Sequence, residues 1–366
     1  MAKCIYPPMI IIVQQIIPPF RLPLFRKISS RFCQPTIIAA GKAYPGTDRR
    51  SLLDAKGINV HITKNHYLAG GRLVVQTGLL GLLNKNNVNC VIAEFNVRIL
   101  SNLILFAYCQ MKGIRFIWWG HGLGKTGGRL IKAIRLWLIK KSDGIILYDH
   151  ISANKLKSLG IDERIIHVSS NTVDIEQIKK FRGLYKTKPR NSILYVGRLT
   201  AAKKVDLLLK GFSKVSKDMQ HKLLIVGDGA ERDKLENLSN KLGIRNQTIF
   251  AGEITQEAEL SQYFNRSFVS VSPGYIGLSA IHSLAYGVPL LIAKDEPHSP
   301  EISVFKKGVN GHYFESNNET SLAQMLTKMV NNPENLTEMG NQGMKTVDDN
   351  YSIDIMVKAF KEAVEE

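Results

Sequence analysis

The chain of 366 residues is longer than one hydrophobic core usually supports, so its length predicts two domains of roughly 150–200 residues each. Its hydrophobic content of 44% and charged content of 22% are typical of a soluble globular protein. The net charge of +18 is unevenly spread, because residues 1–190 hold 30 basic and 9 acidic residues, whereas residues 191–366 hold 19 and 22. We therefore expect the first half to meet an anionic partner, and both an anionic membrane surface and nucleic acid fit that charge.

The longest early apolar run is too short to span a membrane. It covers Met9–Val13, is followed by two glutamines and is flanked by proline pairs, far short of the ~18–20 residues that a spanning helix needs. It also lacks the layout of a signal peptide, so we expect that it neither crosses a membrane nor directs export. The four cysteines (Cys4, Cys33, Cys90 and Cys109) form no CxxC pair, which predicts reduced thiols in a cytoplasmic protein.

The first half alternates short apolar strands with longer segments. Helical patterns, such as Leu73–Leu83 and Arg129–Lys141, lie between several of the strands. This alternation predicts βαβ units and a parallel sheet. Residues Gln177–Ser192 are basic, contain Pro189 and lack a sustained period, which indicates an interdomain linker. The expected strands are Ile10–Val13, Thr36–Ala40, Asn59–Ile62, Cys90–Glu94, Arg115–Trp119, Gly144–Tyr148 and Ile165–Val168.

A second alternating series follows the linker. Helical patterns such as Val205–Val215 and Glu231–Leu242 separate its strands. We therefore expect an α/β protein with two doubly wound Rossmann-like domains, residues 1–180 and 181–350, and a C-terminal helix over 351–366 that could pack back on the first domain. Ligands of such sheets bind at the carboxyl ends of the strands, here in a cleft between the domains. The strands are Ile193–Gly197, Lys222–Gly227, Thr248–Ala251, Ser267–Ser272, Pro289–Ala293 and His312–Phe314.

Several strands of the second series end in glycine-containing turns before a helical pattern. Such turns present backbone N–H groups and helix N-termini to a phosphate. Arg198 and Lys203, five residues apart after one strand, add positive charge, so a nucleoside diphosphate is the expected ligand. The turns are Gly197-Arg198-Leu199, Gly227-Asp228-Gly229 and Gly274-Tyr275-Ile276-Gly277-Leu278.

These segments resemble the retaining glycosyltransferases of family 4, which have the two-Rossmann GT-B fold. Gly197-Arg198-Leu199 with Lys203 and Asp206 is similar to the family's Gly-Arg-Leu-x-x-x-Lys-Gly-x-Asp segment, although the family's Glu before the lysine and Gly after it are Ala202 and Lys204. Asn171-Thr172-Val173-Asp174 resembles its Asn-Gly-Val-Asp. Trp119-Gly120-His121-Gly122 resembles the place where the family carries a histidine that faces the donor sugar.

The resemblance implies which residues bind and turn over the donor. Arg198, Lys203 and His121 would be catalytic. The donor-binding residues would be Gly197, Gly227, Gly229, Gly252, Tyr275, Ile276, Gly277 and Leu278. To these we add Gly274, His282 and Glu301, at or near positions where this chain departs from the family.

One departure from the family pattern concerns the sugar and the ribose. The family carries a Glu-x7-Glu pair around Gly-Phe-Gly-Leu, with one carboxylate on the donor sugar and the other on the ribose. Alignment on Gly277-Leu278 places Gly274 and His282 at these positions. A neutral imidazole accepts only one hydrogen bond, so we expect His282 to make one ribose contact or to leave the ribose to Glu301. We expect Gly274 to let the backbone approach the β-phosphate or the sugar.

The expected chemistry is cleavage of a sugar–diphosphate bond, which leaves negative charge on the phosphates. Arg198 and Lys203 are suited to stabilise that charge. No Asp-x-Asp occurs in the chain, so we expect no metal and no cofactor, with a UDP- or GDP-linked sugar as the substrate. His121, after the apolar Phe116–Trp119 run, is either a structural histidine or, as the resemblance implies, a contact of the donor sugar.

The acceptor side is expected at Pro19, Arg21 and Glu94. Pro19 and Arg21 follow the first strand, where the resemblance places an N-terminal active-site loop. Glu94 ends the strand that begins at Cys90, and it could contact the acceptor or pair with an arginine.

Two basic clusters mark the first half. Basic and apolar residues interleave over Arg129–Lys141, which is typical of a membrane-surface helix but also of a core-packed helix with a solvated basic face. The second cluster lies near the expected acceptor loop and consists of Arg21, Arg26, Lys27 and Arg31. With the charge imbalance, these clusters favour docking on an anionic membrane over binding of nucleic acid.

We therefore expect transfer of a sugar from a nucleoside diphosphate to a lipid-linked saccharide, with retention of the anomeric configuration. The resemblance implies bacterial surface-polysaccharide assembly, with the protein bound peripherally on the inner face of the cytoplasmic membrane. Two alternatives stay open. One is a transferase of the same fold with a soluble or nucleic-acid acceptor, and the other is a catalytically idle docking subunit.

Overall fold

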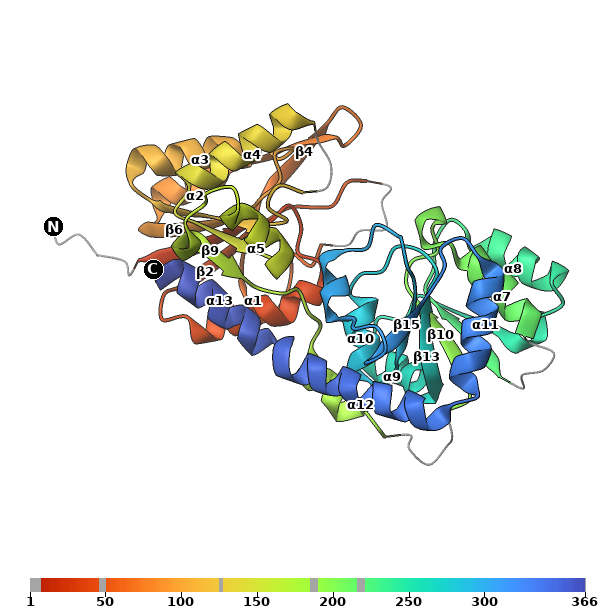
Figure 1. Cartoon of the computed structure of the whole chain (residues 1–366). Helices are drawn as coiled ribbons and strands as arrows, with labels where there is room; N and C mark the ends of the chain where they lie inside the picture. The colour runs from red at the N-terminus through yellow and green to blue at the C-terminus, as the bar shows by residue number, and fades with distance from the viewer. Residues whose placement is uncertain (1–7, 46–50, 125–127, 185–189, 216–220, 366) are drawn as a thin grey trace. The chain divides into compact units, whose positions relative to one another are not determined.

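The computed structural model describes residues 8–45, 51–124, 128–184, 190–215 and 221–365 (Figure 1). The chain divides into two compact units, of which the first consists of Met1–Ser170 and Ile353–Glu366 and the second of Asn171–Ser352. Each unit is built on a parallel sheet with helices on both faces, which is the doubly wound architecture that the alternating pattern predicts.

The sheet of the first unit has the strand order β3-β2-β1-β6-β7-β8-β9. The chain winds from β1 outward to β3 and then from β6 outward to β9, so the direction of winding reverses between β1 and β6. The strands are β1 (Met9–Val13), β2 (Thr36–Ala40), β3 (Asn59–Ile62), β6 (Val88–Glu94), β7 (Arg115–Gly120), β8 (Gly144–Leu147) and β9 (Ile166–Val168).

Helices cover both faces of this sheet. The helices α2 (Leu79–Lys85), α3 (Leu100–Lys112), α4 (Arg129–Lys141) and α5 (His150–Lys157) share a core on one face. On the other face lie α1 (Leu22–Arg31), which follows the 3-10 turn η1 (Pro19–Arg21), and the last helix, α13 (Ile353–Glu365). The ring of Phe360 in α13 meets the ring of Trp119 edge-on, with 4.8 Å between their centroids.

The helix expected over Leu73–Leu83 is wrong in its first half. Instead, β5 (Leu73–Thr77) pairs antiparallel with β4 (Lys64–Leu68), and α2 begins only at Leu79. Residues 73–77 include β-branched side chains, and burial alternates along them with Val74 and Gln76 buried, as in a strand. Gly78, at φ 94°, separates this strand from α2 in a conformation that glycine adopts easily.

The sheet of the second unit has the strand order β12-β11-β10-β13-β14-β15, and its winding reverses between β10 and β13. Apolar residues fill these strands because helices cover both faces. The strands are β10 (Ser192–Val196), β11 (Lys222–Val226), β12 (Thr248–Gly252), β13 (Ser267–Ser272), β14 (Leu290–Ala293) and β15 (Gly311–Phe314).

One face of this second sheet carries α7 (Val205–Val215), α8 (Arg232–Lys241) and α11 (Glu319–Val330). The other carries α6 (Ile175–Phe181), α9 (Glu257–Arg266), α10 (Ser279–Ala285) and α12 (Pro333–Asn350). The helix α6 corrects the first part of the expected linker over Gln177–Ser192, because Ile175 and Ile178 are buried in the second core. For the same reason the units divide after Ser170, earlier than the expected boundary at residue 180. Residues 185–189 of the expected linker lie outside the described ranges.

Within the described ranges, no helix combines the length and the apolarity that a membrane span requires. Cys33 is an exposed free thiol, whereas Cys90 and Cys109 are buried free thiols. Burial raises the pKa of both buried thiols to about 12, so they are protonated and unreactive at neutral pH. Cys4 lies outside the described residues.

Candidate functional site

Arg198, Lys203 and the segment Gly274–Leu278 lie where the sheet of the second unit reverses winding. There β10 and β13 are neighbours, and the segments that follow them lead to α7 on one face and to α10 on the other. The N–H of Tyr275 donates to the carbonyl of Ala202 at 3.1 Å, which joins the two segments. Open α/β sheets bind ligands outside the carboxyl ends of their strands at such a reversal.

Lys203, at the end of the 3-10 turn η3 (Ala201–Lys203), connects the two segments through its side chain. Its ammonium donates to the carbonyl of Tyr275 at 2.6 Å and lies 4.8 Å from the centre of the Tyr275 ring. Burial lowers the pKa of Lys203 to about 8, with Arg198 acting in the same direction and Glu301 in the opposite one. The site therefore disfavours the charged form of Lys203 when it holds no anion.

Arg198 follows β10 and has an exposed side chain. Its guanidinium has no carboxylate partner among the residues that the structure describes, and its charge acts against that of Lys203. Two cations that repel each other at one strand end are both stabilised when an anion binds beside them. The oxygens of a diphosphate can accept hydrogen bonds from both side chains, so the pair has the chemistry of a diphosphate site.

The glycine turns after β10 and β11 pack directly against each other, and the turn after β11 also contacts the end of β12. The N–H of Gly227 donates to the carbonyl of Gly252 at 2.7 Å. A Cβ atom on Gly227 would overlap the carbonyl oxygen of Gly197, and one on Gly229 would overlap the backbone of the same β10 turn. These glycines thus allow the turns to touch, and their contacts fix the backbone that carries Arg198.

Gly274 has a structural role that the sequence does not reveal. A Cβ atom at this position would overlap the carbonyl oxygen of Ala202 and lie 3.0 Å from the carbonyl oxygen of Lys203. The space beside Gly274 is therefore filled by the chain's own backbone. Glycine is needed here for contact between the two segments, whether or not a ligand also lies close.

The segment Tyr275–Leu278, which leads into α10, is held by residues that the sequence did not single out. The N–H of Ile276 donates to Nδ1 of His298 at 3.3 Å, and Nε2 of His298 donates to the carbonyl of Ala293 at 2.9 Å. Ser299 donates to the carbonyl of Ile276 through its hydroxyl at 2.8 Å and its N–H at 3.1 Å. These bonds fix the segment before any ligand binds, so little reorganisation is left for the reaction.

His282 lies in α10 with its side chain directed to α9. Its Nε2 is 3.0 Å from Oε1 of Glu257, and its ring stacks on Phe264 with 4.6 Å between the centroids. The hydroxyl of Tyr286 donates to the same oxygen of Glu257 at 2.6 Å. Burial raises the pKa of Glu257, but its bonds to His282 and Tyr286 bring that pKa below its ordinary value, so Glu257 is ionised. Sequence reasoning missed Glu257, because nothing distinguishes it from the other acidic residues at the start of α9.

Glu301 is a buried carboxylate in the 3-10 turn η5 (Pro300–Val304). It accepts a hydrogen bond from Nδ2 of Asn171 at 2.8 Å, and its charge raises the pKa of Lys203. Asn171 belongs to the Asn-Thr-Val-Asp motif, whose Asp174 caps α6 by accepting the N–H of Gln177 at 3.0 Å. The motif therefore orients Glu301 and begins a helix.

In the first unit, Glu94 ends β6 beside the reversal between β1 and β6. Its Oε2 accepts the N–H of Gln15 at 3.2 Å, and its carbonyl accepts a hydrogen bond from Nδ2 of Asn102 at 2.9 Å. The ion pair with an arginine that the sequence left open for Glu94 does not occur in the described part of the chain. Pro19 is exposed and begins η1.

Arg21, His121 and Tyr148 come together near the ends of β1, β7 and β8. Arg21 donates to the hydroxyl of Tyr148 at 2.5 Å and to Oε1 of Gln14, and its guanidinium lies over the ring of Trp119 at 4.2 Å. His121 is exposed, and its ring centre is 4.7 Å from that of Tyr148. Arg21 is thus anchored within the unit, and Tyr148, which the sequence did not single out, links it to His121.

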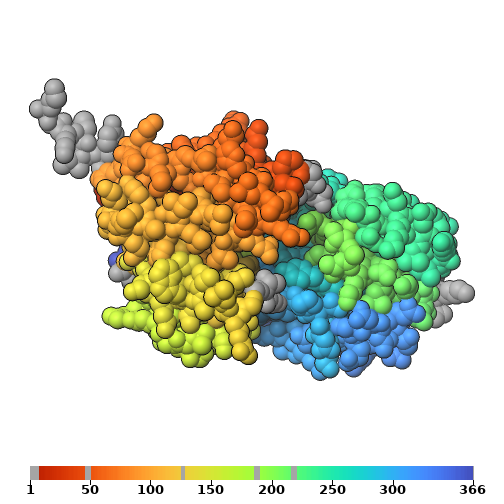
Figure 2. Space-filling model, turned by 90° about the horizontal axis from the view of Figure 1, so that it is seen from above, coloured from red at the N-terminus to blue at the C-terminus, as the bar shows by residue number. Residues whose placement is uncertain are grey.

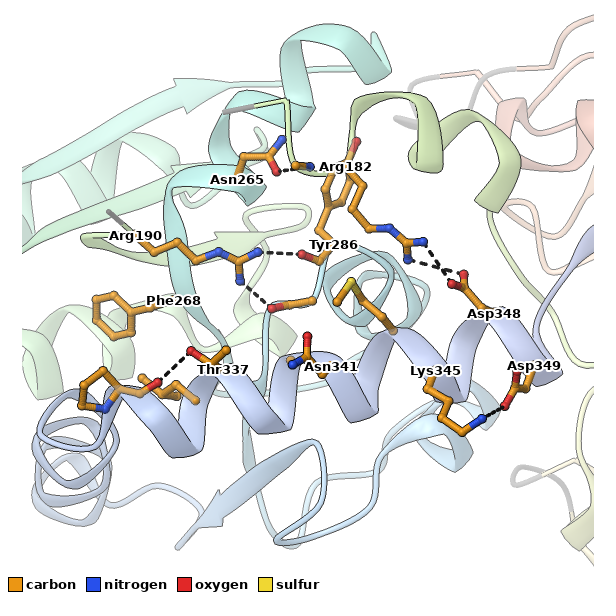
Figure 3. A pocket seen from close by; sticks show the side chains of 16 residues that line it. Arg182, Arg190, Asn265, Phe268, Tyr286, Thr337, Asn341, Lys345, Asp348 and Asp349 are labelled. Atoms are coloured by element: carbon orange, nitrogen blue, oxygen red, sulfur yellow. Dashed lines mark hydrogen bonds and ion pairs between the residues drawn. The ribbon is translucent and has the colours of Figure 1, made fainter. Parts of the chain in front are cut away.

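A separate cavity of about 970 Å³ lies beside α12 and contains none of the expected site residues (Figure 3). Arg182 pairs with Asp348 at 3.0 Å, and Arg190 donates to the carbonyls of Tyr286 and Gly287. Figure 3 shows both arginines with these bonds as dashed lines. Both guanidinium groups are therefore satisfied by acceptors of the protein itself. We assign no ligand to this cavity.

The fold defines a structural class. Two doubly wound α/β units, each with a winding reversal in its parallel sheet, are the features expected of the GT-B fold. Residues 175–346, most of the second unit, match the model of the family "Glycosyl transferases group 1". In the described residues, no group of three or more His, Cys, Asp and Glu side chains is arranged to hold a metal ion.

Known proteins resemble the chain in structure and in sequence. The crystal structure of Anabaena HepE in complex with UDP has a TM-score of 0.74 and 14% identity over 98% of this chain and 99% of that one, which confirms the GT-B fold. An uncharacterised glycosyltransferase of Methanocaldococcus jannaschii is 27% identical over 185 residues, which cover 50% of this chain but only 47% of that relative. The O-antigen biosynthesis glycosyltransferase WbnH of Escherichia coli is 26% identical over 289 residues, or 74% of this chain and 76% of the relative. Together with the family match, these relatives support a glycosyltransferase of GT-B fold.

Proposed function

We propose that the protein is a retaining, metal-independent glycosyltransferase that moves a sugar from a nucleoside diphosphate to a lipid-linked saccharide. The observation that carries the proposal is the pair Arg198 and Lys203 at the reversal between β10 and β13, where burial and Arg198 hold the pKa of Lys203 at about 8. An anionic diphosphate would stabilise both cations. The UDP complex of HepE and the O-antigen role of WbnH support a nucleotide-sugar donor and a saccharide acceptor.

In the proposed reaction, the bond between the anomeric carbon and the diphosphate oxygen lengthens, and negative charge develops on the diphosphate. Arg198 and Lys203 stabilise this charge more strongly as the bond breaks, which lowers the barrier. The ammonium form of Lys203 is the active one, because a neutral amine supplies no positive charge. The acceptor hydroxyl forms the new bond on the same face, and its proton passes to the departing phosphate.

We assign the ribose to Glu301 in preference to His282. Glu301 is buried, is oriented by Asn171 and acts on the charge of Lys203, whereas His282 is bonded to Glu257. A hydrogen bond to a charged group contributes about 1.5–3 kcal/mol, so Glu301→Gln should weaken nucleoside diphosphate binding by that amount, and His282→Gln by less. Equal losses in the two variants would contradict the assignment.

The first unit would supply the acceptor side, with Pro19, Arg21 and Glu94 near the ends of β1 and β6 and the exposed His121 as a sugar contact. Residues 1–190 hold 30 basic and 9 acidic residues, which supports a position on the anionic inner face of the cytoplasmic membrane. There a lipid-linked acceptor and a cytoplasmic donor are both available.

Donor turnover by the purified protein tests the proposal. Release of nucleoside diphosphate from UDP- and GDP-linked sugars is measured, and proton NMR follows the anomer of the sugar that first appears. We expect turnover that EDTA does not reduce and a product that keeps the donor configuration. Arg198→Ala and Lys203→Ala should each lower turnover by about 10²–10³-fold. A loss in EDTA that divalent metal restores would contradict the metal-free mechanism, and an inverted product would contradict retention.

The absence of the family's two carboxylates, at Gly274 and His282, is the observation behind one alternative, a catalytically idle subunit that binds nucleotide and docks to a membrane or a partner. Such a subunit would bind nucleoside diphosphate but release none from any nucleotide sugar.

The other alternative is a transferase with a soluble acceptor. Its donor turnover would be the same with and without a lipid-linked saccharide.

A further inference from the structure

We propose that α4 anchors the first unit in an anionic bilayer by inserting an exposed apolar stripe among the lipid chains. Leu130, Ile134 and Trp137 form this stripe, because spacings of four and three residues place side chains on one face of a helix. Their exposed fractions are 75%, 43% and 56%. Leu138 and Ile139 face the other way and are buried in the core of the unit, so the packing of α4 leaves the stripe uncovered.

Basic side chains border the stripe. Arg129, Lys140 and Lys141 are exposed, and α4 contains no acidic residue. Helices that lie in a membrane interface combine apolar side chains among the acyl chains with lysine and arginine at the headgroups. Arg135 does not belong to this surface, because its half-buried guanidinium donates to the carbonyl of Leu123 and burial lowers its pKa.

The chemistry of this surface fits anionic lipid better than a second copy of the chain. A second copy would bring the same basic residues against α4, and like charges repel. Anionic headgroups would instead pair with Arg129, Lys140 and Lys141 while the lipid chains cover the stripe. Figure 2 shows the surface of α4 (yellow) on the face presented to the viewer. Two further exposed apolar residues, Ile104 and Met111, lie on α3, which covers the same face of the sheet.

This inference deepens the proposed function and rests on it for the reason to dock, namely a lipid-linked acceptor. Insertion itself does not depend on turnover, so the two can fail separately. The chain contains three tryptophans, and Trp118 and Trp119 are only 1% and 0% exposed, so Trp137 alone can change from water to lipid. Its fluorescence therefore reports on α4.

The full chain is titrated with phosphatidylcholine vesicles and with vesicles that also contain phosphatidylglycerol. We expect a blue shift of tryptophan emission with the anionic vesicles, quenching when their acyl chains are brominated, and little response to neutral vesicles. Salt should weaken the binding, because screening reduces the attraction of lysine and arginine to headgroups. Trp137→Phe should remove the blue shift while the protein still pellets with anionic vesicles.

A double variant, Leu130→Ser with Ile134→Ser, should pellet with anionic vesicles about tenfold less strongly, because apolar burial supplies much of the binding of such helices. Ile249→Ser is the matched control, since Ile249 is 43% exposed in the second unit. The melting temperatures of the two variants without vesicles establish that both fold. Thermal shifts with UDP and GDP report independently whether the donor site is intact.

Two results would overturn the inference. One is the absence of a blue shift and of quenching by brominated chains, whether or not the protein pellets with anionic vesicles. The other is a blue shift that depends on protein concentration without lipid, which would identify a contact between copies. If Trp137 enters the bilayer but the melting temperature does not change with UDP or GDP, the proposed function is contradicted and the inference about α4 stands.

Discussion

At the scale of single residues, Lys203 decides how the site responds to pH. Burial and Arg198 hold its pKa at about 8 in the free protein. A bound diphosphate favours the ammonium, so the pKa of Lys203 is higher in the complex than in the free protein. Binding therefore takes up protons at pH values above about 8, and the affinity for nucleoside diphosphate falls as pH rises through that value.

Calorimetric titration between about pH 7 and pH 9.5, in buffers of different ionisation enthalpy, measures both effects. Lys203→Arg is the matched variant, because arginine keeps its charge throughout this range. It should bind with an affinity that changes little with pH. A wild-type affinity that stays constant over the range would show that Lys203 does not contact the diphosphate.

The sequence could single out Arg198 and Lys203 as candidates because both follow an apolar strand that ends in a glycine turn. It could not identify Tyr148, Glu257 or His298. Their contacts join segments that are distant in the chain, as when His298 bonds to Ile276, and only the folded structure shows them. Glu301 was a candidate because it is a carboxylate not far downstream of His282, but the sequence could not predict its hydrogen bond with Asn171.

At the scale of elements, the segments after β10 and β13 behave as one piece because Gly274 lets their backbones touch. In Gly274→Ala the new methyl group would overlap the carbonyl oxygen of Ala202, so the segments must separate. Overpacking of this kind costs about 1–3 kcal/mol, and we expect a lower melting temperature and weaker nucleoside diphosphate binding. The melting temperature is measured on the ligand-free variant, and nucleoside diphosphate binding is measured by calorimetric titration.

Gly81→Ala is the control for this change. A Cβ atom on Gly81, in α2, meets no atom within 4 Å, and alanine favours a helix over glycine by about 0.5–1 kcal/mol. Its stability should therefore stay the same or rise, with binding unchanged. If Gly274→Ala unfolds at the wild-type temperature, the close contact between the two segments is not as described.

The strands β2, β3 and β13 and the helix α7 have the bounds that the sequence predicts, because short apolar runs or a helical period end there at polar or glycine residues. The β4–β5 hairpin was missed. Its turn depends on positive φ at Ala69, Gly70 and Gly71, and buried Gln76 is fixed by a bond to the carbonyl of Gln14. Neither feature is visible in a local pattern.

At the scale of the whole molecule, the alternation of strands and helices was sufficient to predict two doubly wound units and the strand ends at which the candidate site lies. It could not decide between the two interpretations of α4. Both share one sequence pattern, and only packing shows that Leu138 and Ile139 lie inside while Leu130 and Trp137 lie outside. The division after Ser170 was missed for the same reason, since it depends on where α6 packs.

The central claim is that Arg198 and Lys203 bind the diphosphate of a nucleotide sugar. Calorimetric titration with UDP and GDP, against uridine and guanosine, tests it most directly. We predict that one diphosphate binds far more tightly than its nucleoside and that Arg198→Ala and Lys203→Ala each weaken its binding by about 10–100-fold, as expected for charge-assisted hydrogen bonds, without affecting the nucleoside. Equal affinity of diphosphate and nucleoside for the wild-type protein, or full diphosphate affinity in both variants, would contradict the claim.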